Sequence, residues 1–206
     1  MHSSWREQKL QRSTHLSGDT FEEEVLSVLK RYTDSVWHNI KIETLLTQQG
    51  YTELDIVFCH AELIYVLELK RVSEIKGAYG DSKWLMRGWK NRNLETNEYW
   101  AMNVIEQNNI HCRSLSDLYH SEFRHFPTIV PVVVVPNDCT FPEELSGQVY
   151  HLEDLEEYVR SLNRGVDKYM GYRVSYLLGD NSHVVPRKDF AERRRKSGSE
   201  VRGKRR

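Results

Sequence analysis

Residues 52–70 read TELDIVFCHAELIYVLELK, and the pattern of this stretch decides the fold. Two runs rich in β-branched and aromatic residues, Leu54–Cys59 and Leu63–Leu69, are typical of strands. The short polar break between them predicts a β-hairpin that turns on Ala61 and Glu62. This turn lacks the Asn-Gly or Asp-Gly signature that hairpins favour, so the register is inferred from the strand pattern.

The hairpin brings charged side chains together. A turn centred on residues 61–62 places Asp55 directly opposite Glu68, and Lys70 shares their face because side chains alternate along a strand. Directly opposed residues have Cβ atoms about 4.5–5.5 Å apart, and like charges there destabilise the pair. A divalent cation with oxygen ligands, Mg²⁺ or Mn²⁺, would relieve that repulsion. The added charge of Lys70 could orient a water or offset developing negative charge. The ordinary alternative is a hairpin whose charges face solvent.

The composition is that of a soluble, single-domain protein. A chain of 206 residues can bury a sizeable core, and 39% hydrophobic with 29% charged residues is an ordinary balance. No apolar run reaches the roughly 18 residues of a membrane span, and the polar N-terminus is unlike a signal peptide. Three cysteines without a CxxC spacing favour a reduced, cytosolic setting. The pairs Cys59-His60 and His111-Cys112 lack a zinc-ligand spacing, so we do not predict a zinc site.

A helix is predicted before the hairpin. Thr20-x-x-Glu23 forms a capping box, and apolar residues then recur at helical spacing. Glu22 lies beside that apolar stripe, so its carboxylate could point at the edge of the sheet. The alternative is an acidic first turn that only complements the helix dipole.

A second helix is predicted over Glu98–Leu118, with Trp100 on its buried face. Gln107 and His111 interrupt that face, and buried polar groups need partners. If they face the hairpin, they could contact a metal-bound water or a substrate phosphate. A core histidine with its hydrogen bonds satisfied is the commoner outcome for His111.

Glycines, tryptophans and cations are interleaved between the hairpin and the second helix. This mixture suits contact with a phosphate backbone and unpaired bases. The residues expected to make that contact are Lys76, Lys83, Trp84, Arg87 and Lys90. The alternative is an irregular β-excursion whose tryptophans pack on the sheet.

The remaining pattern completes an α/β sandwich around a mixed sheet. We expect strands at 36–46, 129–135 and 149–152, a closing helix at 153–163 and an edge segment at 174–178. The chain then divides into an N-terminal arm (1–16), a domain (17–165), a C-terminal edge segment (166–186) and a basic tail (187–206).

The basic tail holds ten Lys/Arg and three Asp/Glu, a local balance of +7 within a chain of net charge −1. We expect it to be disordered and able to grip a nucleic-acid backbone by charge neutralisation. A solvated or partner-binding extension is an equal alternative.

In their order and spacing, the residues at 18–162 resemble the nuclease-related domain family, a branch of the PD-(D/E)XK, or restriction-endonuclease-like, superfamily. The family's Gly-Glu-x-x-Val helix is matched by Phe21-Glu22-x-x-Val25, with phenylalanine for glycine. Its Thr-x-Ile-Asp and Glu-x-Lys elements are matched by Thr52-x-Leu54-Asp55 and Glu68-Leu69-Lys70. Gly77, Gly80 and Trp84 fit its glycine-containing excursion.

The most specific match is Asn103-Val104-x-x-Gln107-Asn108-x-x-His111. It departs from the family's Asn-Pro-x-x-Gln-Asn-x-x-His helix only at the proline, and the valine there is expected to continue the helix further back.

The resemblance implies a restriction-endonuclease-like three-layer sandwich with a mixed central β-sheet flanked by helices. It implies that Asp55, Glu68 and the Leu69 backbone carbonyl hold Mg²⁺ or Mn²⁺. It also implies that Lys70 orients the attacking water and that Glu22 and Gln107 complete the catalytic site. For His111, the resemblance implies a structural role near that site.

We therefore expect a cytoplasmic, metal-dependent endonuclease that hydrolyses phosphodiester bonds of DNA, with no membrane association. Two alternatives stay open: a non-cleaving nucleic-acid-binding module of the same fold, and an RNA-directed nuclease with the same residues. The sequence contains no helicase, kinase or DNA-reading motif, so specificity would need a partner protein or an uncommon loop. A homodimer would allow double-strand cutting.

Overall fold

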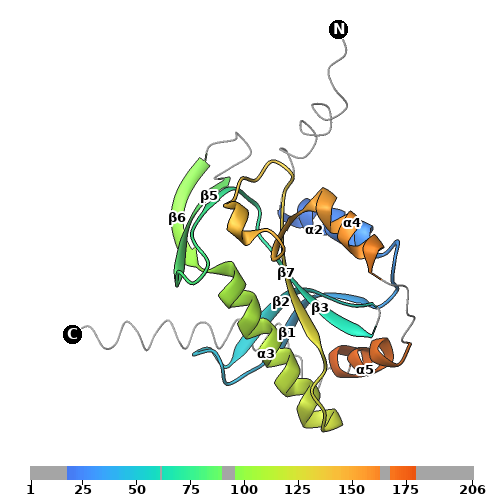
Figure 1. The fold of residues 1–206 in the computed structure, drawn as a ribbon. Coiled ribbons are helices and arrows are strands. Elements are labelled where there is room, and N and C mark those ends of the chain that lie inside the picture. The colour runs from blue at the N-terminus through green and yellow to red at the C-terminus, as the bar shows by residue number, and fades with distance from the viewer. Residues whose placement is uncertain (1–17, 61, 90–95, 163–167, 180–206) are drawn as a thin grey trace, which may run out of the picture.

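The computed structural model describes residues 18–60, 62–89, 96–162 and 168–179. The elements in these ranges are α2 (Gly18–Leu29), β1 (Val36–Glu43), β2 (Tyr51–His60), β3 (Leu63–Leu69), β4 (Val72–Lys76), β5 (Lys83–Trp89), β6 (Thr96–Met102), α3 (Val104–Phe123), β7 (Ile129–Val135), η1 (Glu143–Leu145), β8 (Val149–His151), α4 (Leu152–Ser161) and α5 (Lys168–Gly179). Figure 1 shows their arrangement. The predicted N-terminal arm and basic tail lie outside the described residues.

Five strands form the central sheet, in the order β1-β2-β3-β7-β8. β1, β2 and β3 pair antiparallel, whereas β3, β7 and β8 pair parallel, which confirms the predicted mixed sheet. The hairpin register is also confirmed, because Ile56 pairs with Leu67 and Cys59 with Ile64, centred on residues 61–62. Burial of both faces specifies this register, since a slip by one residue would exchange the side chains of the two faces.

Helices cover both faces of the central sheet (Figure 1). On one face, α2 and α4 contribute Leu29 and Leu155 to a buried cluster that includes Phe58 of β2. On the other face, α3 and α5 pack against a cluster that includes Leu115 and Val57. Val57 and Phe58 are neighbours in one strand and therefore point to opposite faces. The result is the predicted three-layer sandwich.

A second sheet, β4-β5-β6, is antiparallel throughout and takes up most of the segment between the hairpin and α3. One face of this small sheet packs through Ile75, Trp84 and Met86 into a third buried cluster. A parallel bridge between Glu74 and Thr140 joins the small sheet to the segment that follows β7.

Both predicted helix starts need correction. Residues 96–102 form β6, and α3 begins only at Val104, so the helix predicted from Glu98 is wrong at its start. Asn103 sets the boundary, because its side-chain oxygen accepts hydrogen bonds from the N–H groups two and three residues further on. Trp100, expected on a buried helix face, is 69% exposed.

The first helix starts earlier than predicted. α2 begins at Gly18, so Thr20 lies within its first turn and is not its N-cap. In the second helix, Val104 is the first residue of α3. The expectation that this valine continues the helix further back is therefore wrong.

Asn103 also ties α3 to the small sheet. Its Nδ2 donates to the carbonyl oxygen of Asp81 at 2.8 Å, and its backbone N–H donates to that of Ser82 at 3.1 Å. The end of β6 and the start of α3 are therefore held to the turn that precedes β5.

The C-terminal segment is helical, and the predicted edge segment at 174–178 is wrong. Val174, Leu177 and Leu178 lie on α5 and are buried in the cluster that contains α3. Their spacing is that of a helix face, whereas a strand would alternate. α5 thus shares the core of the central sheet.

Asn108 fastens α3 to the central sheet. Its side chain is buried, and Nδ2 donates to the carbonyl oxygens of Val66 and Val132, each at 3.0 Å. These two carbonyls belong to the neighbouring strands β3 and β7, so one amide group holds the helix to both.

Replacing this side chain should destabilise the protein. Asn108→Ala should lower the free energy of unfolding by about 1–3 kcal/mol, because two buried hydrogen bonds are lost. Urea denaturation measures this change. The neighbouring Asn109 is exposed, so Asn109→Ala should stay within about 0.5 kcal/mol of the parent chain. Equal effects of the two substitutions would contradict the anchoring role.

Candidate active site

The candidate site lies where the central hairpin opens. Pairing between β2 and β3 ends at Ile56 and Leu67, one pair short of Asp55 and Glu68. Beyond that point, the Leu69 N–H donates to Asp55 Oδ2 at 2.8 Å, so a side chain replaces the backbone of the partner strand. The two predicted carboxylates therefore meet at the open end of the hairpin.

Glu68 is 1% exposed, and donor groups surround its carboxylate. Oε1 lies 2.6 Å from Lys70 Nζ and accepts a hydrogen bond from Gln107 Nε2 at 2.8 Å. Oε2 lies 3.1 Å from His111 Nδ1. Gln107 and His111 are four residues apart and therefore share one face of α3. The structure thus brings together Glu68 of β3, Lys70 directly after it, and both predicted residues of the second helix.

The two carboxyl groups differ in acidity. Burial, followed by the charge of Glu68, raises the pKa of Asp55 to about 7. Burial also acts to raise the pKa of Glu68, but the close contact with His111 and the charge of Lys70 outweigh it and hold that pKa below its ordinary value. Glu68 is therefore the fixed negative charge of the site at neutral pH, with Asp55 close to half-ionised. Neighbouring carboxyl groups with divergent pKa values are typical of functional sites.

Glu22 reaches the central sheet at β1, next to the strand that carries Asp55. Its Oε1 accepts a hydrogen bond from Asn39 Nδ2 at 2.7 Å and lies 2.8 Å from His38 Nδ1. Asn39 has a left-handed backbone conformation (φ 54°), and the register of β1 with β2 passes over Asn39 and Asp55, which would otherwise face each other. The contacts of Glu22 are therefore with β1, and it lies one strand away from the carboxylate pair.

Sequence reasoning missed two residues of this region. His38 and Asn39 sit in an alternating strand pattern, and the one available signal was that Asn tolerates a left-handed conformation better than most residues. Asn108 was part of the helix motif but had no role assigned, and the structure shows that it is buried and anchors α3. The polar residues of 103–111 thus divide their roles between capping, anchoring and holding Glu68.

The donor set fits a hard divalent cation. Asp55 and Glu68 offer carboxylate oxygens, and the Leu69 backbone offers a carbonyl oxygen beside them. Mg²⁺ commonly binds through one or two carboxylates and keeps water and substrate phosphate as its other ligands, so it needs no closed protein cage. Burial and the charge of Glu68 raise the pKa of Asp55 despite the nearby charges of Lys70 and His111, so a cation bound here would favour its ionised form.

In the described part of the chain, no group of three or more His, Cys, Asp and Glu side chains is placed to hold a metal ion, so a closed site of the zinc type does not form there. Cys59, Cys112 and Cys139 are buried free thiols. Burial raises the pKa of Cys112 to about 12, and burial with nearby acidic charge does the same for Cys139, so neither is a reactive thiolate.

Of the residues predicted to contact nucleic acid, Lys76, Lys83 and Arg87 share the solvent face of the small sheet, whereas Trp84 points to its opposite face. Trp84 is 0% exposed, so its ring cannot stack on a base, and the alternative that it packs in the core is correct. Lys76 and Arg87 form ion pairs with acidic residues of the small sheet. Lys83 is exposed, whereas Lys90 lies outside the described residues.

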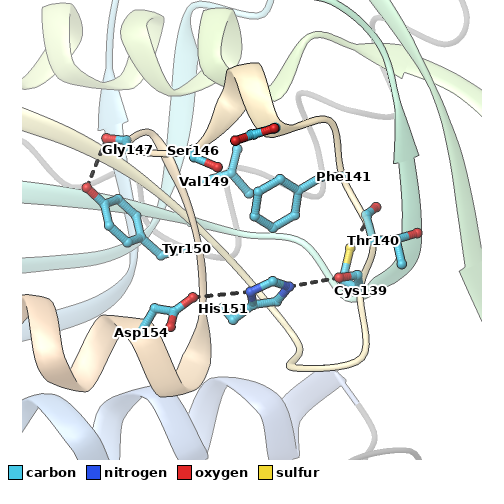
Figure 2. Close-up of a pocket in the computed structure, with 10 residues that line it drawn as sticks. Cys139, Thr140, Phe141, Ser146, Gly147, Val149, Tyr150, His151 and Asp154 are labelled. Carbon is cyan, nitrogen blue, oxygen red and sulfur yellow. Dashed lines mark hydrogen bonds and ion pairs between the residues drawn. The ribbon is translucent and has the colours of Figure 1, made fainter.

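A separate open pocket of about 610 Å³ lies between the segment after β7 and the start of α4 (Figure 2). His151 crosses this pocket, with Nε2 2.8 Å from the Cys139 carbonyl oxygen and Nδ1 3.2 Å from Asp154 Oδ2. The ring of Phe141 packs on His151 with centroids 4.9 Å apart. The lining does not include the carboxylate pair, so this pocket is distinct from the candidate active site.

None of the helices in the described ranges combines the length and apolar character needed to cross a membrane.

The mixed five-stranded sheet, covered by helices on both faces, defines a restriction-endonuclease-like α/β fold. The model of the nuclease-related domain family matches residues 17–136, which is more than half of the chain. This chain belongs to that family. Comparison with curated proteins and with solved structures gave no match.

The charge of Asp55 should limit stability in the absence of a metal. A folded-state pKa of about 7 exceeds the ordinary value, so the folded protein prefers the neutral carboxyl group, and that preference is lost as the pH rises from about 4 through 7. Asp55→Asn removes the charge and keeps an acceptor for the Leu69 N–H. In EDTA at pH 8, this variant should therefore unfold several degrees above the parent chain.

Thermal unfolding at pH 5, 6, 7 and 8 measures the difference, which should grow across this range. Asp117→Asn on the exposed side of α3 is the matched control and should show no such trend. A difference that is constant with pH would contradict the raised pKa of Asp55.

Proposed function

We propose that this chain is a metal-dependent endonuclease that hydrolyses phosphodiester bonds of DNA. The observation that carries the proposal is the pair of carboxyl groups at the open end of the hairpin, with Lys70 2.6 Å from Glu68. The carboxylates supply hard oxygen ligands, and the lysine supplies a cation at the same point. Membership of a nuclease-related family supports the same conclusion.

The residues of the site would divide the work. Asp55, Glu68 and the Leu69 carbonyl would hold Mg²⁺ or Mn²⁺, which when bound polarises the scissile phosphate. Lys70 would orient the attacking water and stabilise the negative charge that builds on the phosphate in the transition state. Gln107 and His111 would keep Glu68 in position through the contacts they already make. Glu22 would complete the site from α2, through its contacts with β1.

The proposal of DNA as the substrate rests on basic residues outside the site. Phosphate contacts carry no base information, so the site residues do not separate DNA from RNA. Lys83 is an exposed cation of the small sheet, and the basic tail carries a further balance of +7 that would neutralise phosphates. Specificity for a sequence would come from a partner protein.

Cleavage assays test the proposal directly. The full chain is incubated with supercoiled plasmid, single-stranded DNA or single-stranded RNA, in Mg²⁺, Mn²⁺ or EDTA. Cleavage should require the metal and fall by at least about 100-fold in Lys70→Ala, the usual effect of losing a transition-state charge partner. Lys30 is an exposed lysine directly after α2, and Lys30→Ala should cleave like the parent chain.

Each other result has a definite meaning. Nicking of supercoiled plasmid identifies an endonuclease, and cleavage of RNA alone would replace DNA as the substrate. Binding without cleavage in any metal would support the non-cleaving module and overturn the proposal. Equal cleavage by Lys70→Ala and the parent chain would point to a contaminating nuclease.

Metal binding can be measured without activity. A cation that binds only the folded state at about 100 times its dissociation constant adds about 2.7 kcal/mol, or roughly 5–10 °C in Tm for a chain of this size. Mn²⁺ or Mg²⁺ should therefore raise the Tm of the parent chain, and Asp55→Ala should lose most of that rise. Asp117→Ala is the matched control. An equal rise in both variants would exclude Asp55 as a ligand.

A further inference from the structure

Strand β6 is exposed along nearly its whole length. Six of its seven residues are exposed, and only Ala101 is partly covered. Trp100 is 69% exposed, Met102 49% and Tyr99 40%. Large apolar side chains therefore reach solvent on both faces of one short strand, which is unusual for a surface that meets only water.

The outer edge of β6 is also unpaired within the described residues. β6 is the last strand of the small sheet and pairs with β5 alone, in an unbroken register from Lys83–Met102 to Trp89–Thr96. Edge strands that remain solvent-exposed usually carry Lys, Pro or a bulge that prevents further pairing. The sequence TNEYWAM has none of these, and its one charged side chain, Glu98, is paired with Arg87 and Lys76. Figure 1 shows β6 on the outside of the molecule.

The charges beside Trp100 favour a protein partner over nucleic acid. Trp100 pairs across the sheet with Leu85, and Glu98 pairs with Arg87, so these side chains share the solvent face. Arg87 Nη2 lies 2.7 Å from Glu98 Oε1 and Nη1 lies 2.9 Å from Glu74 Oε2, so its charge is already balanced. Phosphate would meet two carboxylates here.

Lys76 is balanced in the same way. Its Nζ lies 3.4 Å from both Glu74 Oε2 and Glu98 Oε1. The solvent face of the small sheet therefore carries an apolar strip bordered by these paired charges of both signs, with the exposed Lys83, which pairs across the sheet with Met102, at one end. Such a surface is compatible with an identical copy of itself. A two-fold axis brings the same patch of both copies together, and a border with charges of both signs can then meet charges of opposite sign.

We propose that β6 pairs antiparallel with β6 of a second copy of this chain. The pairing joins the two small sheets into one six-stranded sheet and covers Trp100 and Tyr99 of each copy. Aromatic side chains bury about 150–250 Å² each, so the four rings with their neighbours would bury roughly 1,000 Å² in total. This area lies at the lower limit for stable complexes, so the dimer should dissociate in the micromolar range.

Sedimentation of the full chain tests the proposal. The chain is purified free of nucleic acid and measured at about 1–300 µM in 0.5 M salt. Its mass should rise from 24.4 kDa toward twice that value. Trp100→Lys should weaken the association at least tenfold, since it places two lysines near the two-fold axis. Tyr172→Lys is the matched control, because Tyr172 is 74% exposed on α5, and it should dimerise like the parent chain.

Three results would overturn the proposal: a monomer at all concentrations, a dimer that Trp100→Lys leaves unchanged, and equal loss in Tyr172→Lys. Amide hydrogen exchange on the unmodified chain is a second test, and it does not depend on whether a substituted chain folds. Amides of residues 97–101 should exchange more slowly at 200 µM than at 2 µM, whereas those of α5 should not change. Unchanged exchange in β6 would contradict strand pairing.

If Trp100→Lys impairs nucleic-acid binding by a chain that is monomeric throughout, the surface instead contacts the substrate.

Discussion

Burying a carboxylate costs several kcal/mol unless its oxygens are paired and hydrogen-bonded. Glu68 meets that requirement with partners from two parts of the chain, Lys70 directly after its own strand and Gln107 with His111 on α3. The position of α3 on the sheet is therefore tied to the neutralisation of one charge. Removing any of these partners would leave buried negative charge on Glu68 with less compensation, so the geometry of the site and the packing of the helix depend on each other.

The remainder of the fold supports this arrangement. Asn108 holds α3 to β3 and β7 one residue away from Gln107, and Asn103 determines where the helix begins. Together they fix the rotation of the helix about its axis, which decides whether Gln107 and His111 face Glu68. On the sheet side, burial of both faces of the central hairpin excludes a one-residue slip that would turn Asp55 and Glu68 toward α2 and α4.

The central sheet and the carboxylate pair could be predicted because their signals are local. A buried strand alternates with period two and a buried helix face recurs with period 3.6, and the site residues occupy those patterns. β6 carries no such signal, since a strand exposed on both faces has no periodicity, and Trp100 fell on a helical spacing by coincidence. The ion pairs that balance Lys76 and Arg87 depend on cross-strand register, and the burial of Trp84 depends on contacts with β7 and α3. These are tertiary facts that a mixture of cations and aromatic residues does not reveal.

The small sheet is connected to the site at both of its ends. β4 begins two residues after Lys70, and β6 leads through Asn103 into the helix that carries Gln107. Asn103 is also hydrogen-bonded to the turn before β5. The β5–β6 hairpin of the small sheet therefore has little freedom to rotate independently of α3. A displacement of the small sheet would therefore be transmitted as strain to the two groups that contact Glu68 Oε1. In mechanical terms, the small sheet is coupled to the Glu68 carboxylate at two points, Lys70 and Gln107.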